Sequence, residues 1–284
     1  MLVRVVLSGV VAVSTLSCSV NILENFADKN TNEAYYADAV ALLNDGDYSG
    51  ALAKIALMTG VYPAHRKVVA LKAAAHAGIC GLTFIPFVQA MGDLGSTRLL
   101  PFLVSQFKNA TGARIDACRT AEDLIESIGA IAERTTDENL LLALISFAKI
   151  GNVLSYYTDA GQDGTADAGV NPCLNARGSR PSAAVAGDFY ESDLRELGTG
   201  ITLALNNIDA ISSSVSLGSD SLSDINGVCA TLASINAAYD FCSITDPSAF
   251  TANHLKGIMS LIKEDSSVGL GTNCSGDISA CNCP

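Results

Sequence analysis

Apolar side chains recur at a helical period along almost the whole chain after Glu33, and this periodicity limits the fold more than any other feature. In the first such segment, Tyr35, Ala39 and Leu42 fall on one helix face, and the turn residues at 44–47 follow. Several alternating strands in series occur nowhere in the sequence. The pattern therefore predicts an all-α protein built from antiparallel helical hairpins.

Capping signals place several of the helix starts. Thr135 and Glu138 have the spacing of a capping box, and Asp246 before Pro247 has the pattern of an N-cap followed by a first-turn proline. The apolar run at 140–148 predicts a buried core helix, because it is too short to cross a bilayer. After a helix around 51–58, further helices are predicted at about 63–79, 84–94, 97–108, 115–134, 136–157, 191–212, 222–241 and 247–263.

The N-terminus has the layout of an export signal. Arg4 is the only charge before the apolar run at 5–13, which is far shorter than the roughly 20 residues of a membrane-spanning helix. The end of the segment, up to Cys18, resembles a bacterial lipobox, although Thr15 stands where that motif usually has leucine. The resemblance implies that Cys18 becomes the mature N-terminus and carries acyl chains such as palmitate. The alternative is an ordinary secretory signal that leaves Cys18 as a free thiol.

Composition then divides the chain into five parts. Residues 158–187 are rich in Gly, Ala, Asp, Ser and Pro and have no apolar period, which predicts a long central loop. The expected organisation is a signal peptide at 1–17, a lipid-anchored tether at 18–31, a helical repeat-like half at 32–157, the acidic Gly-rich loop at 158–187, and a C-terminal helical half with a Cys-rich tail at 188–284.

The charge of the chain excludes one class of partner. With 29 acidic and 17 basic residues, the chain has a net charge of −12. Phosphate backbones would repel it, so a nucleic-acid partner is not expected. Anionic lipid headgroups would repel it as well, so the acyl chains rather than a basic patch must hold it at the membrane.

Eight cysteines remain after Cys18, an even number in an exported chain, which predicts up to four disulfides. The metal alternative requires paired Cys-x-x-Cys or Cys/His spacings, and the sequence has none. Eight cysteines allow 105 pairings, of which Cys80–Cys118 is our suggestion for the N-terminal half. We expect the tail cysteines to tie residues 264–284 back onto the C-terminal helices. The eight are Cys80, Cys118, Cys173, Cys229, Cys242, Cys274, Cys281 and Cys283.

One segment, about residues 33–63, resembles the second half of a tetratricopeptide repeat. In such repeats a small residue lets two antiparallel helices approach closely, and a tyrosine fills the gap beside the turn. The resemblance implies a stack of helical hairpins, although it fades over the next 34 residues, and a generic helical hairpin is the alternative. The residues that carry it are Tyr35, Gly46, Tyr48, Ala51, Ile55, Met58 and Pro63.

The acidic segment within the central loop resembles the calcium loops of thrombospondin type 3 repeats and dockerins. Asp159, Asp163 and Asp167 are spaced so that alternate carboxylates could share one cation. Two positions depart from the pattern, because Gly161 replaces a second Asp or Asn and Val170 replaces the final Glu. The resemblance implies a Ca²⁺ site, and a solvated acidic loop is the alternative.

No catalytic motif is present, so we do not expect an enzyme. The sequence lacks nucleophile-elbow, phosphate-loop and His-Glu-x-x-His patterns. His76 and His254 fall on ordinary helices, and the pair Asp123 and Glu126 is typical of a solvated acidic face. An enzyme would require ionisable groups that converge in a cleft.

The export signal, the helical repeats and the length together resemble the lipoproteins that serve as T-components of TRAP transporters. The resemblance implies a non-catalytic scaffold in the periplasm that binds a protein partner, and Ser19 after Cys18 implies the outer membrane. The alternative is a carrier of small apolar molecules. A large cavity lined by Phe84, Phe87 and Leu100 would favour the carrier, and a solid core with a concave polar face would favour the scaffold.

Overall fold

The structure is a computed structural model that describes residues 30–95, 97–173, 189–207, 219–272 and 274–283. The described residues form ten α-helices and no β-strand, which confirms the predicted all-α class. Cys18 and most of the tether lie outside them. The helices are α2 (Asn32–Asn44), α3 (Tyr48–Ala56), α4 (Arg66–Cys80), α5 (Phe84–Gly92), α6 (Leu99–Gln106), α7 (Gly112–Glu126), α8 (Thr136–Thr158), α9 (Glu191–Asn206), α11 (Ser219–Ile235) and α12 (Ala252–Lys263).

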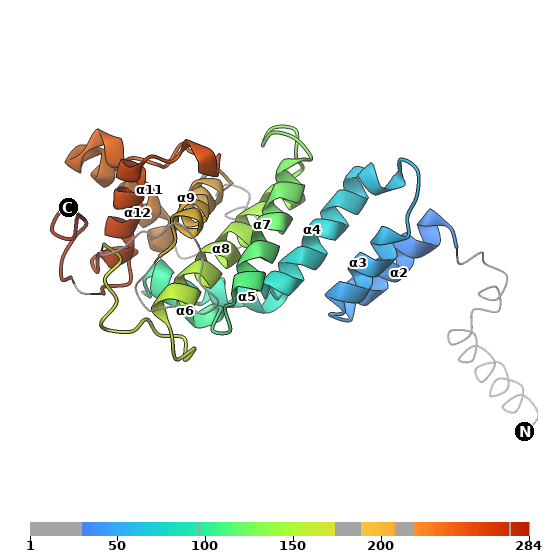
Figure 1. Cartoon of the computed structure of the whole chain (residues 1–284), viewed down its shortest axis with the longest axis horizontal. Coiled ribbons are helices and arrows are strands. Elements are labelled where there is room, and N and C mark those ends of the chain that lie inside the picture. The colour runs from blue at the N-terminus through green and yellow to red at the C-terminus, as the bar shows by residue number, and fades with distance from the viewer. Residues whose placement is uncertain (1–29, 96, 174–188, 208–218, 273, 284) are drawn as a thin grey trace, which may run out of the picture.

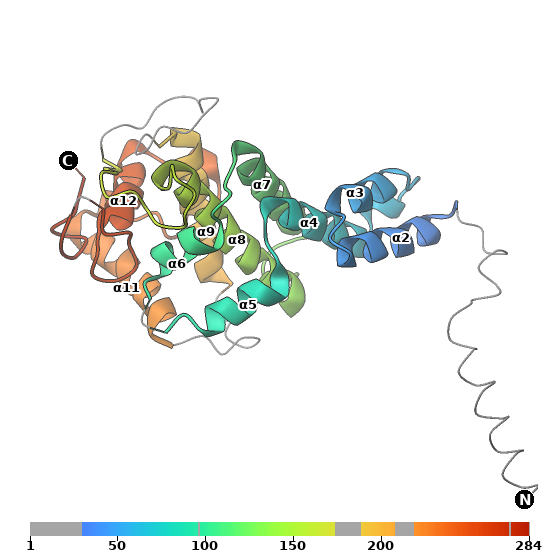
Figure 2. The same cartoon turned by 90° about the horizontal axis from the view of Figure 1, so that it is seen from below.

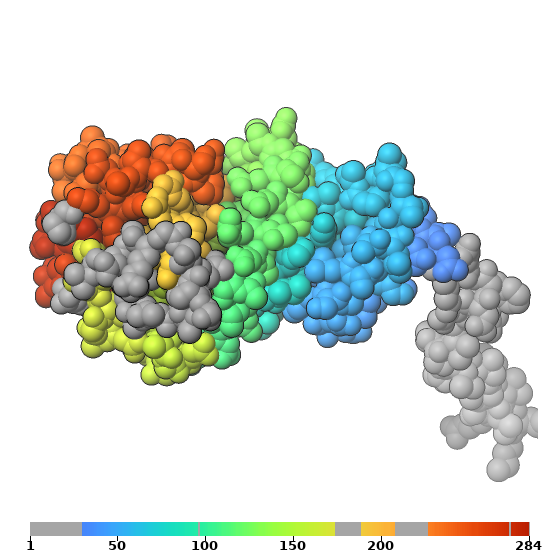
Figure 3. All heavy atoms as spheres, viewed as in Figure 1, coloured from blue at the N-terminus to red at the C-terminus, as the bar shows by residue number. Residues whose placement is uncertain are grey.

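Most helices form one continuous row across the molecule. In the order α2, α3, α4, α7, α8 and α9, each helix contacts the next (Figure 1). Helices α5 and α6 leave this row between α4 and α7, and α6 packs against α8 (Figure 2). The N-terminal hairpin therefore occupies one end of an elongated molecule, and the C-terminal helices occupy the other (Figure 3).

Helix α8 is the centre of the larger of two hydrophobic cores. Leu142, Leu144 and Phe147 lie on different faces of the helix and all are buried. By length and composition α8 could span a membrane, but 83% of its apolar window is buried inside the protein. A helix that is apolar on every side and covered by other helices is a core helix. This confirms the prediction for residues 140–148.

The smaller core belongs to the N-terminal hairpin. Ala51 and Ile55 of α3 are buried against α2 and α4, and a Cβ atom at Gly78 of α4 would lie 2.3 Å from the ring of Tyr48. Glycine at this position therefore lets the tyrosine ring lie directly on the α4 backbone. The core consists of Ala39, Ala51, Ile55, Met58, Val68, Leu71 and Ala75.

Several predicted helices differ from those observed at one or both ends, and the structure explains two of these differences. The helix expected at 115–134 ends at Glu126, because the following segment folds back on itself and Arg134 donates a hydrogen bond of 2.8 Å to the carbonyl of Gly129. The helix expected from Pro247 begins at Ala252, because Asp246 caps only a short 3₁₀ turn. Thr251 supplies the cap of α12, through a hydrogen bond from the backbone N–H of His254.

Four disulfides join all eight cysteines that follow Cys18, and Cys80–Cys118 is among them as suggested. The expectation that the tail cysteines bind the C-terminal helices was wrong. Cys283 joins Cys173 in the acidic loop, 110 residues away, and the other two tail cysteines pair with each other. Cys283 is therefore the only tail cysteine whose disulfide reaches the rest of the chain. The other two bridges are Cys229–Cys242 and Cys274–Cys281.

The tail is attached to α12 through a buried carboxylate. Glu264, directly after α12, accepts hydrogen bonds from the backbone N–H groups of the next turn. Burial alone would raise the pKa of Glu264, but these donors stabilise the charged form and lower it. The donors to Glu264 are Ser266, Ser267, Val268 and Gly269. The tail also bonds to α12 itself, because the backbone N–H of Leu270 donates a hydrogen bond of 2.8 Å to the carbonyl of Ile262.

Candidate functional site

An apolar groove lies where α4 gives way to α5, and we call it the α5 groove. Gly81 ends α4 with φ +99°, and the chain turns by 69° into α5. The hollow has a volume of about 340 Å³ and is bounded by the α2–α3 hairpin, α4, the start of α5, and Leu141 of α8. Its lining residues are Leu43, Asn44, Tyr48, Ala74, Ala77, Leu82, Thr83, Phe84, Ile85, Pro86 and Leu141.

Helix α5 has one face toward the core and one toward the groove. Phe87 and Met91, four residues apart, are buried in the larger core. Phe84 and Ile85, in the first turn, are 44% and 67% exposed. Exposed side chains of this size beside a hollow mark a surface that another molecule can cover.

Acidic residues border the same groove. Asp45 and Asp47 occupy the exposed turn between α2 and α3, next to the lining residue Asn44. Asp47 also accepts a hydrogen bond of 2.8 Å from the backbone N–H of Gly50, which fixes its position at the start of α3. The groove therefore combines an apolar floor with negative charge at one edge.

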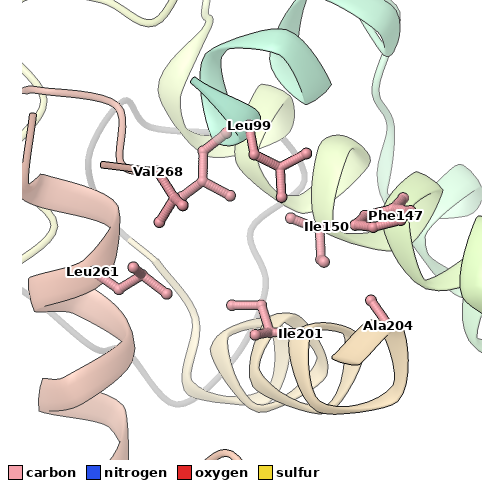
Figure 4. A pocket seen from close by; sticks show the side chains of 8 residues that line it. Leu99, Phe147, Ile150, Ile201, Ala204, Leu261 and Val268 are labelled. Carbon is pink, nitrogen blue, oxygen red and sulfur yellow. The ribbon is translucent and has the colours of Figure 1, made fainter. Parts of the chain in front are cut away.

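A second cavity lies inside the larger core and is fully apolar in its lining (Figure 4). Its volume is about 10 Å³, which is the space of one water molecule, and an apolar cavity of this size stays dry. Leu100 lines this cavity, Phe84 lines the α5 groove, and Phe87 is packed in the core between helices. The three residues named for an apolar-ligand cavity therefore do not line one common cavity.

A buried charge cluster joins α7, α8 and α9. Lys149 of α8 is fully buried, and its Nζ atom contacts Glu122 and lies 3.1 Å from Glu196 Oε2. Thr199 Oγ1 accepts a further hydrogen bond of 2.8 Å from this ammonium, and Arg119 Nε lies 2.9 Å from Glu196 Oε1. Every charge in the cluster has an opposite partner, so we assign it to holding three helices together.

The cluster shifts the proton affinities of its members. Burial raises the pKa of Glu122 to about 7, and Lys149 only partly offsets this effect. Burial alone would lower the pKa of Lys149, but attraction to Glu122 and Glu196 outweighs it and raises that pKa. The lysine therefore stays protonated. Lys149 could have been found from the sequence, because it is an ionisable residue inside an otherwise apolar helix. A lysine in such a helix must be buried and therefore needs a carboxylate partner.

The acidic loop uses its carboxylates to hold its own backbone. Asp159 is buried and accepts hydrogen bonds from the N–H groups of Asp163 and Gly164 at 3.1 and 2.7 Å. Asp167 accepts one from the N–H of Ala160 at 3.0 Å. In the part of the chain that the structure describes, no three His, Cys, Asp or Glu side chains are grouped to hold a metal. Calcium binding by Asp159, Asp163 and Asp167 stays a prediction.

The pair Asp123 and Glu126 separates into two environments. Asp123 is exposed, as expected for a solvated face, whereas Glu126 is half-buried and lines a cleft together with Arg134 and Asn207. Sequence reasoning missed the last two residues, because Arg134 was placed at the end of a predicted helix and Asn207 has no local motif. His254 serves in a helix cap.

The described residues thus form an apolar groove with an acidic edge and polar clefts, and the buried charges that join α7, α8 and α9 are paired. The exposed apolar residues Phe84 and Ile85 indicate a surface that binds another molecule. Comparisons of the chain with protein-family models, with curated proteins and with solved structures give no match.

Proposed function

We propose that this chain is an exported lipoprotein that acts as a non-catalytic scaffold for a protein partner. Acyl chains on Cys18 anchor it to the outer membrane, and its helical domain faces the periplasm. The observation that carries the proposal is the α5 groove, in which Phe84 and Ile85 remain exposed beside a hollow of about 340 Å³. Solvent exposure of two large apolar side chains costs free energy that a partner would recover by covering them.

The arrangement of helices supports a repeat-like scaffold related to the T-component lipoproteins of TRAP transporters. Tyr48 packs on Gly78 of the next helix, and Ala51 is buried between helices, as the tetratricopeptide resemblance implies. The next contact in the row is between α4 and α7, so α5 and α6 form an excursion from the stack. Because α5 turns away from α4, the α5 groove forms between α5, α4 and the α2–α3 hairpin.

The partner that best fits the groove is an amphipathic helix with an apolar face and a basic edge. A hollow bounded by helices accepts the apolar face of a further helix, with anchors spaced three or four residues apart. Asp45 and Asp47 at the edge, and the net charge of −12, favour lysine and arginine beside those anchors. Opposite charge would also speed the encounter of the two proteins.

The alternative, a carrier of apolar small molecules, gains no support from the enclosed cavity. Its volume of about 10 Å³ is far below that of any ligand pocket, which is typically about 300–1,000 Å³. A Ca²⁺ ion bound by Asp159, Asp163 and Asp167 would stabilise the acidic loop and is compatible with either function.

The proposal is tested by capturing partners from detergent-solubilised membranes with three forms of the anchored protein. These are the wild type, the double variant Phe84→Ser/Ile85→Ser, and the control Val61→Ser. Val61 is 81% exposed and lies outside the groove. The substitutions are at exposed positions, so all three forms should unfold at similar temperatures.

One protein should be retained by the wild type and the control and lost from the double variant. A synthetic peptide of its basic amphipathic segment should then bind the wild type, and exchange of its lysines and arginines for glutamate should abolish that binding. Equal retention by all three forms would refute the groove as the binding site. Equal binding of both peptides would refute the stated chemistry of the partner.

A further inference from the structure

A further hollow, distinct from the α5 groove and from the cavity in the larger core, lies between the end of α7, the turn that leads to α8, and the end of α9. We call it the Arg134 cleft. Its volume is about 450 Å³, and its lining combines Glu126 of α7 with polar and apolar residues of the turn and of the end of α9. Its lining residues are Glu126, Gly129, Ala130, Ile131, Arg134, Leu203, Asn206, Asn207 and Thr245.

Asn207 places an unsatisfied oxygen in the wall of this cleft. The residue is 1% exposed, and its Nδ2 atom donates a hydrogen bond of 2.7 Å to the carbonyl of Leu203. That bond occupies the amide nitrogen, and Oδ1 has no partner among the residues that the structure describes. A buried acceptor without a donor is unfavourable, so a ligand that supplies an N–H group would be stabilised here.

Glu126 and Arg134 add one charge of each sign. Arg134 donates from Nε to Asn139 Oδ1 and from Nη1 to the carbonyl of Gly129, both at 2.8 Å. Within the described ranges nothing accepts from its Nη2, and nothing donates to the carboxylate of Glu126. Two hydrogen bonds hold the guanidinium in place, and its remaining donors are free to bind a carboxylate.

We propose that the Arg134 cleft binds a small zwitterion, a free amino acid or a dipeptide. The carboxylate of the ligand would pair with Nη2 of Arg134, and its ammonium would donate to Glu126 and to Oδ1 of Asn207. Ile131 and Leu203 would contact an apolar side chain of the ligand. This inference is independent of the proposed scaffold role, because the cleft and the α5 groove share no lining residue.

The test is isothermal titration calorimetry with the full mature protein. The probes are leucine and the dipeptide alanyl-leucine, with isovalerate, isoamylamine and glucose as controls that lack the ammonium, the carboxylate or both. One or both zwitterions should bind, and each control should bind at least about tenfold more weakly. No heat from either zwitterion, or equal binding of any control, would overturn the proposal.

Three variants locate the site. Glu126→Gln keeps the shape of the side chain and should weaken zwitterion binding at least about tenfold, and Asn207→Leu should do the same by removing the acceptor. Glu33→Gln makes the same chemical change at an exposed position on α2 and should leave binding unchanged. Because Asn207→Leu could disturb the end of α9, the result for Glu126→Gln decides. Unchanged binding in that variant would contradict the assignment.

Discussion

Among single residues, Lys149 is a position where substitution should strongly affect stability. It carries a full charge into the larger core and contacts carboxylates from two other helices. Substitution by methionine keeps the length of the side chain but leaves Glu122 buried without its cation and Glu196 with Arg119 alone. We expect Lys149→Met to lower the free energy of unfolding by about 3–5 kcal/mol.

Urea denaturation measures this change, and Lys72→Met is the matched control. Lys72 is exposed on α4, so its substitution should change stability by less than about 0.5 kcal/mol. Equal effects of the two substitutions would mean that the buried cluster does not hold α7, α8 and α9 together.

Glu122 predicts a pH dependence of stability. Its pKa is raised from 4.5 to about 7 in the folded protein, so between these values the folded state holds a proton that the unfolded state has lost. The free energy of unfolding therefore falls as pH rises from 4.5 to about 7. Glu122→Gln should reduce this fall, measured as the slope of stability against pH, whereas Glu33→Gln should retain it. An unchanged slope in Glu122→Gln would show that Glu122 titrates normally.

Local residue chemistry was predictable, and long-range pairing was not. The capping box of Thr135 and Glu138 is present as expected, because both partners lie within one helical turn. Glu138 also pairs with Arg66, 72 residues earlier, and this contact lowers its pKa to about 2. Lys149 could be noticed as an ionisable residue in an apolar helix, but its partners Glu122 and Glu196 could not be named from the sequence. Asn207 became notable only through the elements that bury it, which no local pattern specifies.

At the scale of elements, the two tail disulfides should differ in their effect on stability. Cys173–Cys283 spans 110 residues and Cys274–Cys281 spans 7. A bridge that closes a longer loop removes more entropy from the unfolded chain. Replacing both cysteines by serine should cost about 5 kcal/mol for the long bridge and about 2 kcal/mol for the short one. Thermal unfolding of the two double variants measures the difference, and a larger loss for the short bridge would contradict it.

Helix positions followed from periodicity, but their ends depended on tertiary contacts. The segment at 136–157 was predicted almost to the residue, because a strong cap starts it. The segment at 115–134 was predicted eight residues too long at its end, because Arg134 folds the chain back onto Gly129. The disulfide partner of Cys283 could likewise not be predicted from the sequence, since eight cysteines allow 105 pairings and their spacing does not select one.

At the scale of the whole molecule, the account predicts where the protein resides. The first described helix lies at one end of the row, so a tether from Cys18 would attach the domain by that end. Cys18→Ser should prevent acylation and either release the protein into the soluble periplasmic fraction or stall its processing. Fractionation followed by mass spectrometry of the N-terminus measures both outcomes. A Cys18→Ser protein that is processed normally and stays in the membrane fraction would contradict the anchor.

If the α5 groove of the anchored protein holds a partner, site-specific photo-cross-linking in intact cells should capture that partner. A photoreactive amino acid replaces Ile85 inside the groove or Val61 outside it, both of which are exposed apolar positions. The account predicts that one envelope protein cross-links at position 85 and not at position 61. No cross-linked protein at 85, or the same protein captured equally at both positions, would contradict the account.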